Sequence, residues 1–262
     1  MTTSAQPALT EQSALIDGVT IHYATGPLAE PGTPGVLLLH GWGGSIQSWT
    51  PVTADLLARG RRVLVLDFPG FGKSSLPPFP WGVEDYTRNL IALIEQLGFC
   101  PCSVVAHSFG GRVALVLAAT RPDLVRRLVL TAGAGIRTDA PSALRKLATR
   151  AGKAIFKLPG LSGMREQVIR KVASQDYIEA GPLRETFIKV VSQDLRDFAA
   201  RITVPTLLIW GDQDTDTPLT QAQVLESLIP DSGLVVLHGA GHFAYLEQLP
   251  RFVRILAEFI KD

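Results

Sequence analysis

A serine, a histidine and an aspartate that together can activate a nucleophile occur in this sequence, and the serine is the most clearly placed. Ser108 lies in the segment Ala-His-Ser-Phe-Gly-Gly (residues 106–111), between an apolar β-branched run and a stretch rich in Ala, Leu and Val. This order predicts a strand, a tight turn and a helix, and such a turn lifts a serine hydroxyl above the edge of a sheet. Ala106 stands where glycine is usual, but it is still small. The pattern favours Ser108 as a nucleophile.

A nucleophilic serine needs a base that takes its proton. When the serine lies in a turn of this kind, the acid and the histidine follow it in the chain. Only His238 and His242 follow Ser108. His242 lies in a glycine-rich loop before a predicted C-terminal helix, whereas His238 is expected at a strand end as a partly buried histidine. We therefore expect His242 to be the base.

A carboxylate must orient the imidazole and stabilise its cation. The apolar run at residues 204–210 predicts a buried strand, and the loop after it contains Asp212, Asp214 and Asp216. All three aspartates compete for this role. Aspartates in such loops more often shape a turn or cap a helix, so one acid and two structural residues are expected.

Acyl chemistry also requires N–H donors for the oxygen that becomes negatively charged. The loop His-Gly-Trp-Gly-Gly-Ser (residues 40–45) follows a buried apolar run at residues 36–39 and is placed to supply one of them. Because both this loop and the Ser108 turn follow predicted strands, they are expected at the same edge of a sheet.

Taken in this order, the motifs resemble those of the α/β-hydrolase superfamily, in particular serine esterases and lipases with a small helical cap, from about residue 18 to residue 259. The resemblance implies that Asp214 is the acid, because Gly211, Asp214 and Pro218 match the family's Gly-x-x-Asp-x-x-x-Pro loop. Asp212 is then expected to be a turn residue and Asp216 a helix-capping residue.

The same resemblance implies the donors of the oxyanion hole. They are the backbone N–H groups of Trp42 and Phe109, and His40 is expected to brace its loop without taking part in the chemistry. The segment Asp67–Ser75 is similar to a family loop that shapes the pocket wall, so Asp67 is expected to be structural.

Alternating strand and helix patterns predict an α/β fold, and the resemblance implies a mostly parallel eight-stranded sheet with helices on both faces. A hairpin is expected around Asp17 and Gly18. Further strands are expected near residues 36–40, 62–67, 103–107, 127–132, 204–210 and 234–238, and helices near 47–59, 84–97, 110–121, 219–228 and 245–260. Every chemical motif then falls at the carboxyl end of a strand, where ligands bind in such sheets.

The chain is expected to divide into a hydrolase core, residues 1–136 and 201–262, and a helical cap, residues 137–200. Residues 137–171 hold nine Lys or Arg against two acidic residues, and residues 142–157 have the pattern of a basic amphipathic helix. Such a helix either packs its apolar side on the core and solvates its charges, or attracts anionic substrates or lipid surfaces.

Composition and the motifs that do not occur narrow the classes of function that remain. The net charge of +1 gives no case for nucleic-acid binding, and no phosphate loop, zinc-type Cys/His set or dinucleotide motif occurs, so neither a cofactor nor a metal is expected. Cys100 and Cys102 are too close for an unstrained disulfide, and with no visible signal peptide they favour a cytoplasmic protein. No apolar run is long enough to span a membrane.

The expected partner is a small-molecule ester, and the expected activity is hydrolysis of a small to medium carboxylic ester through an acyl-enzyme. Thioester, lactone and meta-cleavage-type carbon–carbon hydrolysis use the same triad and stay open as alternatives. A relative that binds a ligand without turnover is a further alternative of a different class.

Overall fold

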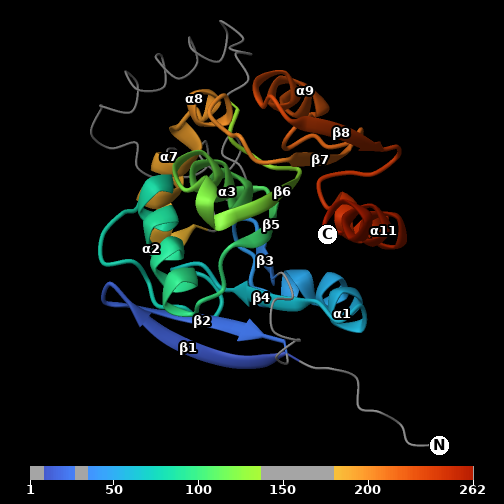
Figure 1. Cartoon of the computed structure of the whole chain (residues 1–262). Helices are drawn as coiled ribbons and strands as arrows, with labels where there is room; N and C mark the ends of the chain where they lie inside the picture. Colours follow the sequence, from blue (N-terminus) through green and yellow to red (C-terminus); the bar gives the residue numbers. More distant parts are fainter. Residues whose placement is uncertain (1–8, 27–34, 137–179, 262) are drawn as a thin grey trace, which may run out of the picture.

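The computed structural model describes residues 9–26, 35–136 and 180–261, and in this part of the chain eight strands form one sheet (Figure 1). Their order is β1-β2-β4-β3-β5-β6-β7-β8. β2 runs antiparallel to both β1 and β4, and all other neighbours are parallel. The mostly parallel eight-stranded sheet is thereby confirmed. The strands are β1 (Thr10–Ile16), β2 (Val19–Thr25), β3 (Gly35–Leu39), β4 (Arg62–Leu66), β5 (Cys102–His107), β6 (Val125–Thr131), β7 (Thr206–Gly211) and β8 (Ser232–Leu237).

The predicted hairpin joins β1 to β2 through Asp17 and Gly18. Both residues have positive φ, 49° and 80° respectively. A two-residue turn with this geometry matches the twist of the flanking strands, and an Asp-Gly pair adopts it with little strain.

Helices cover both faces of the sheet. They are α1 (Thr50–Ala58), α2 (Val83–Gln96), α3 (Phe109–Thr120), α7 (Arg184–Ser192), α8 (Arg196–Ala199), α9 (Leu219–Leu228), α10 (Ala244–Glu247) and α11 (Leu249–Phe259). Because strand side chains alternate between faces, Leu37 of β3 packs in one apolar cluster with α2, α3 and α9, and Leu38 packs in the other with α1, α10 and α11.

The C-terminal helix differs from the prediction. One helix was expected over residues 245–260, but α10 and α11 are separated by Gln248, whose φ is −123° and ψ is 46°. In an unbroken helix the ring of Pro250 would clash with the carbonyl of Leu246. The break therefore puts Pro250 in the first turn of α11, where its missing N–H costs nothing.

Part of the predicted cap is described. In residues 180–200, Val190 and Leu195 are buried in the apolar cluster on the α3 side of the sheet, and the Leu195 N–H donates to the Gly135 carbonyl at 2.9 Å. Residues 137–179 lie outside the described residues, and so does the predicted basic helix at 142–157. The cap as a separate unit stays a prediction.

Cys102 is buried at the start of β5, Cys100 is half-buried, and both are free thiols. In the described ranges no helix is both long enough and apolar enough to cross a membrane. The cytoplasmic setting stays a prediction from the sequence.

Candidate active site

Ser108 occupies a strained turn between β5 and α3. Its φ of 48° and ψ of −110° lie in a region that residues with a Cβ rarely adopt. Hydrogen bonds hold it there, because the Ser108 carbonyl accepts from the N–H groups of Gly111 at 2.9 Å and Ala134 at 3.0 Å. The predicted strand, turn and helix are all present.

The glycines after Ser108 let α3 begin against the neighbouring strand ends. A Cβ on Gly110 would lie 2.5 Å from the carbonyl oxygen of Leu39, and one on Gly111 would lie 2.7 Å from the Cα of Gly133. Larger residues would push α3 and the Ser108 turn away from β3. Glycine at positions 110 and 111 is therefore a steric requirement of this turn.

Asp214 and His242 form a hydrogen-bonded pair. The His242 Nδ1–H donates to Asp214 Oδ2 at 2.9 Å, with the Asp214 side chain fully buried. The Thr217 hydroxyl donates to the same oxygen at 2.7 Å, and the N–H groups of Asp216 and Thr217 donate to Oδ1, each at 2.9 Å. Burial alone would raise the pKa of the Asp214 carboxyl, but the hydrogen bonds from His242 and Thr217 outweigh it and hold this pKa below its usual value.

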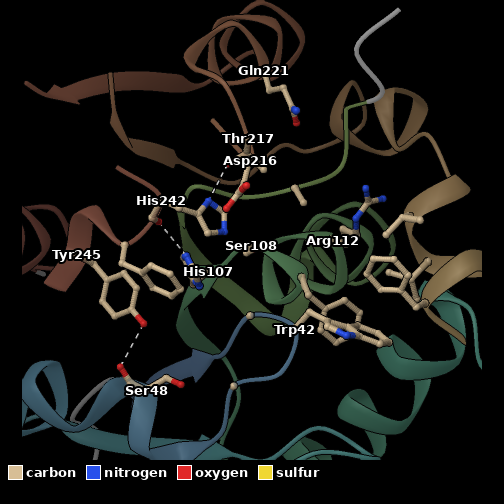
Figure 2. Close-up of a pocket in the computed structure, with 18 of the residues that line it drawn as sticks. Trp42, Ser48, His107, Ser108, Arg112, Asp216, Thr217, Gln221, His242 and Tyr245 are labelled. Atoms are coloured by element: carbon tan, nitrogen blue, oxygen red, sulfur yellow. Dashed lines mark hydrogen bonds between the residues drawn. The ribbon is translucent and has the colours of Figure 1, made fainter. Parts of the chain in front are cut away.

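His242 and Ser108 line the same cavity, and Figure 2 shows the His242 ring beside the position of Ser108. In the described part of the chain, the Nε2 atom of His242 makes no hydrogen bond to the protein. This nitrogen is thus available to a nucleophile or a bound molecule.

His107 supports His242 from beneath, a contact that the sequence did not reveal. Its Nε2–H donates to the His242 carbonyl at 3.1 Å, and the two rings lie 4.8 Å apart (Figure 2). Burial, and next the nearby His242, lower the pKa of His107 to about 3, so this ring is neutral at pH 7. The partners are 135 residues apart in the chain. No local sequence pattern signals such a contact.

The two predicted oxyanion donors both line the cavity. Trp42 lies in the loop after β3, and Phe109 begins α3. Among the described residues, neither backbone N–H has a hydrogen-bond acceptor. The N–H of Phe109 is also one of the free donors that every helix start leaves, with the positive end of the helix dipole behind it.

His40 braces this loop as expected. Its Nδ1–H donates to the Gly41 carbonyl at 2.7 Å, and its Nε2 accepts the N–H of Phe68 at 2.9 Å. Complete burial lowers the pKa of His40 to about 4, so it is uncharged at neutral pH. His40 therefore ties the loop after β3 to the loop after β4 and has no free nitrogen for chemistry.

The other two aspartates of the Asp214 loop differ in how well they match the prediction. Asp212 lies in a turn as expected, and it accepts from Gly239 N–H at 2.8 Å and pairs with His238 at 2.9 Å. The prediction for Asp216 is wrong, because Pro218 is the N-cap of α9 and Asp216 lies beside the cavity. The His238 prediction is also wrong: its side chain is 78% exposed, since the strand ends one residue earlier.

The cavity has a volume of about 450 Å³ and a wall that combines apolar and polar side chains. Its apolar lining includes Trp42, Phe109, Ile136, Phe187, Val190, Val191 and Phe243. Its polar lining, besides Ser108 and His242, includes Arg112, Asp216, Thr217 and Gln221 (Figure 2). The cavity is large enough for a small organic molecule.

A cation site is the alternative use of the acidic residues here. Donor atoms of Asp214, Asp216 and His242 lie within 4.8 Å of one another. However, both Asp214 oxygens already accept hydrogen bonds from protein donors, and His242 Nδ1 bears the proton of one of them. A metal would have to break these bonds, so the arrangement fits an acid–base pair better.

The chain is similar to several known hydrolases. The family model described as "Alpha/beta hydrolase family" matches residues 36–255. A 2-hydroxy-6-oxononadienedioate/2-hydroxy-6-oxononatrienedioate hydrolase of Burkholderia vietnamiensis is 26% identical, over 88% of this chain and 88% of that protein. A 2-hydroxy-6-oxo-2,4-heptadienoate hydrolase of Pseudomonas putida is 28% identical, over 86% of this chain and 88% of that protein. A solved serine hydrolase involved in carbazole degradation superposes with a TM-score of 0.72 at 25% identity, covering 96% of this chain and 98% of that one.

Proposed function

The chain belongs to the alpha/beta hydrolase family, and on that premise we propose that it is a serine hydrolase that cleaves small to medium carboxylic esters through an acyl-enzyme. One observation carries this proposal. The cavity is lined by both Ser108 and His242. Ser108 is held in a strained turn, and His242 Nδ1 lies 2.9 Å from a carboxylate oxygen of buried Asp214. This combination supplies a nucleophile, a base with one free nitrogen, and an acid that fixes the tautomer of the base.

The proposed mechanism begins when Ser108 Oγ attacks the ester carbonyl and His242 Nε2 takes its proton. Asp214 stabilises the resulting imidazolium. The tetrahedral intermediate collapses as His242 protonates the leaving alcohol, which leaves an acyl group on Ser108. Water, activated by His242, then hydrolyses the acyl-enzyme and restores the serine.

In the same mechanism the backbone N–H groups of Trp42 and Phe109 bind the oxyanion. Support comes from their position on the cavity wall and from the lack of any other acceptor for them among the described residues. Donors that are already oriented need no rearrangement when charge develops on the oxygen.

We also propose that residues 137–200 act as a cap on this core. Support comes from the described part of the insertion, in which Phe187, Val190 and Val191 of α7 contribute to the cavity wall. A substrate would then contact the insertion on one side and the strand-end loops on the other.

Hydrolysis of a carbon–carbon bond of the meta-cleavage type is the second candidate. The relatives support it at least as well as they support ester hydrolysis. Two of them, at 26% and 28% identity, are named as hydrolases of 2-hydroxy-6-oxo dienoates. Lactones and thioesters would use the same residues.

The test is hydrolysis of 4-nitrophenyl esters from acetate to palmitate, alongside 2-hydroxy-6-oxohepta-2,4-dienoate. We expect the wild type to hydrolyse the shorter esters and Ser108→Ala to lose at least about a thousandfold in kcat. Ser227→Ala, which removes an exposed hydroxyl on α9, is the matched control. Faster turnover of the dienoate would favour the second candidate, and normal ester hydrolysis by Ser108→Ala would refute the serine mechanism.

A further inference from the structure

Arg112 is a buried cation in the wall of the cavity, and the mechanism above does not use it. Only 7% of this residue is exposed, and its side chain lines the cavity together with Ser108 and His242 (Figure 2). Burial lowers the pKa of Arg112 to about 10, a shift that the nearby Asp194 opposes, so the guanidinium is still charged at pH 7. Buried charges are normally paired, so the partners of this group are informative.

The described residues satisfy only a small part of the hydrogen-bonding capacity of this guanidinium. Arg112 Nη1 donates to the Gln193 carbonyl at 3.0 Å, and this is the only hydrogen bond that its side chain makes within the described residues. Asp194 lies close enough to interact electrostatically, but its two oxygens accept from the backbone N–H of Arg196 at 3.0 Å and from its side chain at 2.8 Å. The remaining Arg112 donors therefore have room for an acceptor from the cavity.

The position of Arg112 relative to Ser108 defines where that acceptor would lie. Ser108 is the N-cap of α3 and Arg112 is four residues later, so both lie on the same face of the helix about 6 Å apart along its axis. Both residues also line the same cavity, so an acceptor bound by the guanidinium lies in the space that Ser108 faces.

Gln221 adds a second uncommitted polar group to the same cavity. Gln221 is only 7% exposed, and its side-chain amide has no hydrogen-bond partner among the described residues. It enters from α9, while Arg112 enters from α3 (Figure 2). Apolar residues, among them Ile136 and Val190, complete the wall.

We propose that Arg112, assisted by Gln221, is a carboxylate-binding subsite, so that the substrate is a monoanion whose carboxylate lies a few carbons from the carbonyl attacked by Ser108. This rests on the proposed function for the identity of the reacting carbonyl, but the subsite itself does not. A guanidinium presents a planar pair of donors that matches a carboxylate. The exposed Asp216 carboxylate on the same cavity disfavours ligands of higher negative charge.

The first test pairs anionic and neutral substrates of the same chain length. These are the mono-4-nitrophenyl esters of succinate, glutarate and adipate, and 4-nitrophenyl butanoate, pentanoate and hexanoate. We expect the wild type to have a higher kcat/KM for at least one anionic ester than for its neutral partner. Arg112→Gln should lower that ratio about 10- to 100-fold, mainly through KM, because a charge-assisted hydrogen bond is lost.

Further variants separate the subsite from general effects of charge or folding. Arg112→Lys should keep part of the ratio, since it retains the charge but not the planar fork. Gln221→Leu should lower the ratio about 3- to 10-fold, since it removes a neutral hydrogen bond. Arg251→Gln removes an exposed charge from α11 outside the cavity and should leave the ratio unchanged. Equal activity on both members of every pair, or a ratio insensitive to Arg112 and Gln221, overturns the proposal.

A binding measurement keeps this proposal separate from the ester mechanism. Titration of Ser108→Ala with monomethyl adipate and monomethyl glutarate requires no turnover. We expect binding that weakens about tenfold or more when Arg112→Gln is added. If the wild type hydrolyses no ester but this dependence is found, the proposed reaction fails and the subsite stands. If esters are hydrolysed but neither half-ester binds in an Arg112-dependent way, the subsite is refuted and the proposed reaction stands.

Discussion

Among the described residues, two aspartate–histidine pairs with a buried aspartate lie at strand ends. Asp67 Oδ2 contacts His22 Nδ1 at 2.8 Å after β4, and Asp214 Oδ2 contacts His242 Nδ1 at 2.9 Å after β7. Both aspartates are almost completely buried. Distance and burial alone would give the two pairs the same role.

The pairs differ in what surrounds them. The second nitrogen of His22 is bonded to Glu11 at 3.1 Å, and Asp67 also accepts the backbone N–H groups of Ile46 at 2.7 Å and Lys73 at 2.8 Å. In contrast, Nε2 of His242 has no hydrogen-bond partner among the described residues, and His242 lines the same cavity as Ser108. An aspartate–histidine contact therefore becomes a candidate for chemistry only when the imidazole has an open nitrogen facing a nucleophile.

The largest effect is expected on kcat, when the Asp214–His242 pair is changed. Asp214→Asn keeps the shape of the side chain but removes the charge that stabilises the imidazolium and selects its tautomer. We expect kcat for a 4-nitrophenyl ester to fall about 10³- to 10⁴-fold, measured by steady-state kinetics. A loss of less than about tenfold would mean that this pair is structural, like the Asp67 pair.

The next largest effect is on stability. Asp67→Asn places an amide N–H₂ where the carboxylate accepted N–H donors, so buried donors lose their acceptor. We expect the free energy of unfolding in urea to fall by about 2 to 3 kcal/mol, with kcat of the folded enzyme changed less than about fivefold. Asp55→Asn, in an exposed ion pair with Arg59, is the control and should change little. A loss of kcat as large as that of Asp214→Asn would contradict the assignment of Asp67 as structural.

A smaller effect is expected when Thr217→Val removes the hydroxyl bonded to Asp214 Oδ2. The pKa of Asp214 should then rise toward its usual value of about 3.9, because one of the hydrogen bonds that lower it is lost. We expect kcat to fall about 2- to 10-fold, since the carboxylate is less firmly oriented. Thr217→Ser should restore most of the activity.

We also expect Thr217→Val to change how the free energy of unfolding depends on pH. A carboxyl group whose folded pKa is lowered contributes stability at neutral pH that is lost as the pH falls through that folded pKa, here below about pH 4. In Thr217→Val this loss should be smaller and should be complete at a higher pH, so the difference between the unfolding free energies at pH 7 and pH 3 should be smaller. Identical pH profiles would show that the hydroxyl does not interact with Asp214.

The smallest effect is expected for Glu11→Gln. The hydrogen bonds from Lys73 and then His22 lower the pKa of this exposed carboxyl. Exposed pairs contribute little, so we expect the unfolding midpoint to shift by at most about 2 °C and kcat by less than about twofold. A large loss of activity would mean that the His22 pair communicates with the cavity, which would remove the distinction between the two pairs.

Individual elements show where sequence reasoning succeeded. The segments around β5 and α9 agree with the structure within a residue or two, because continuous apolar runs and amphipathic stretches follow local rules. The Ser108 turn was predictable for the same reason: a positive φ beside close-packed glycines restricts which residues can follow one another. The break at Gln248 was missed although Pro250 signalled it.

Other features depend on residues distant in the chain. Nothing around Arg112 in the sequence distinguishes a solvated helix residue from a buried cavity residue. Its burial and its hydrogen bond to the carbonyl of Gln193, 81 residues later, come from the tertiary structure. The misplaced role of Asp216 has the same origin, since the start of α9 determines which loop residue is the cap.

By itself, the sequence determined the α/β class, the turn that presents Ser108, and the order of the chemical motifs along the chain, because these depend on short-range patterns of size and hydrophobicity. Only the tertiary structure decided which nitrogen of which histidine stays open, that His107 supports His242, and that a charged Arg112 lies inside the cavity. Burial and hydrogen-bond partners are properties of contacts across the sheet, and such contacts join residues that no local pattern connects.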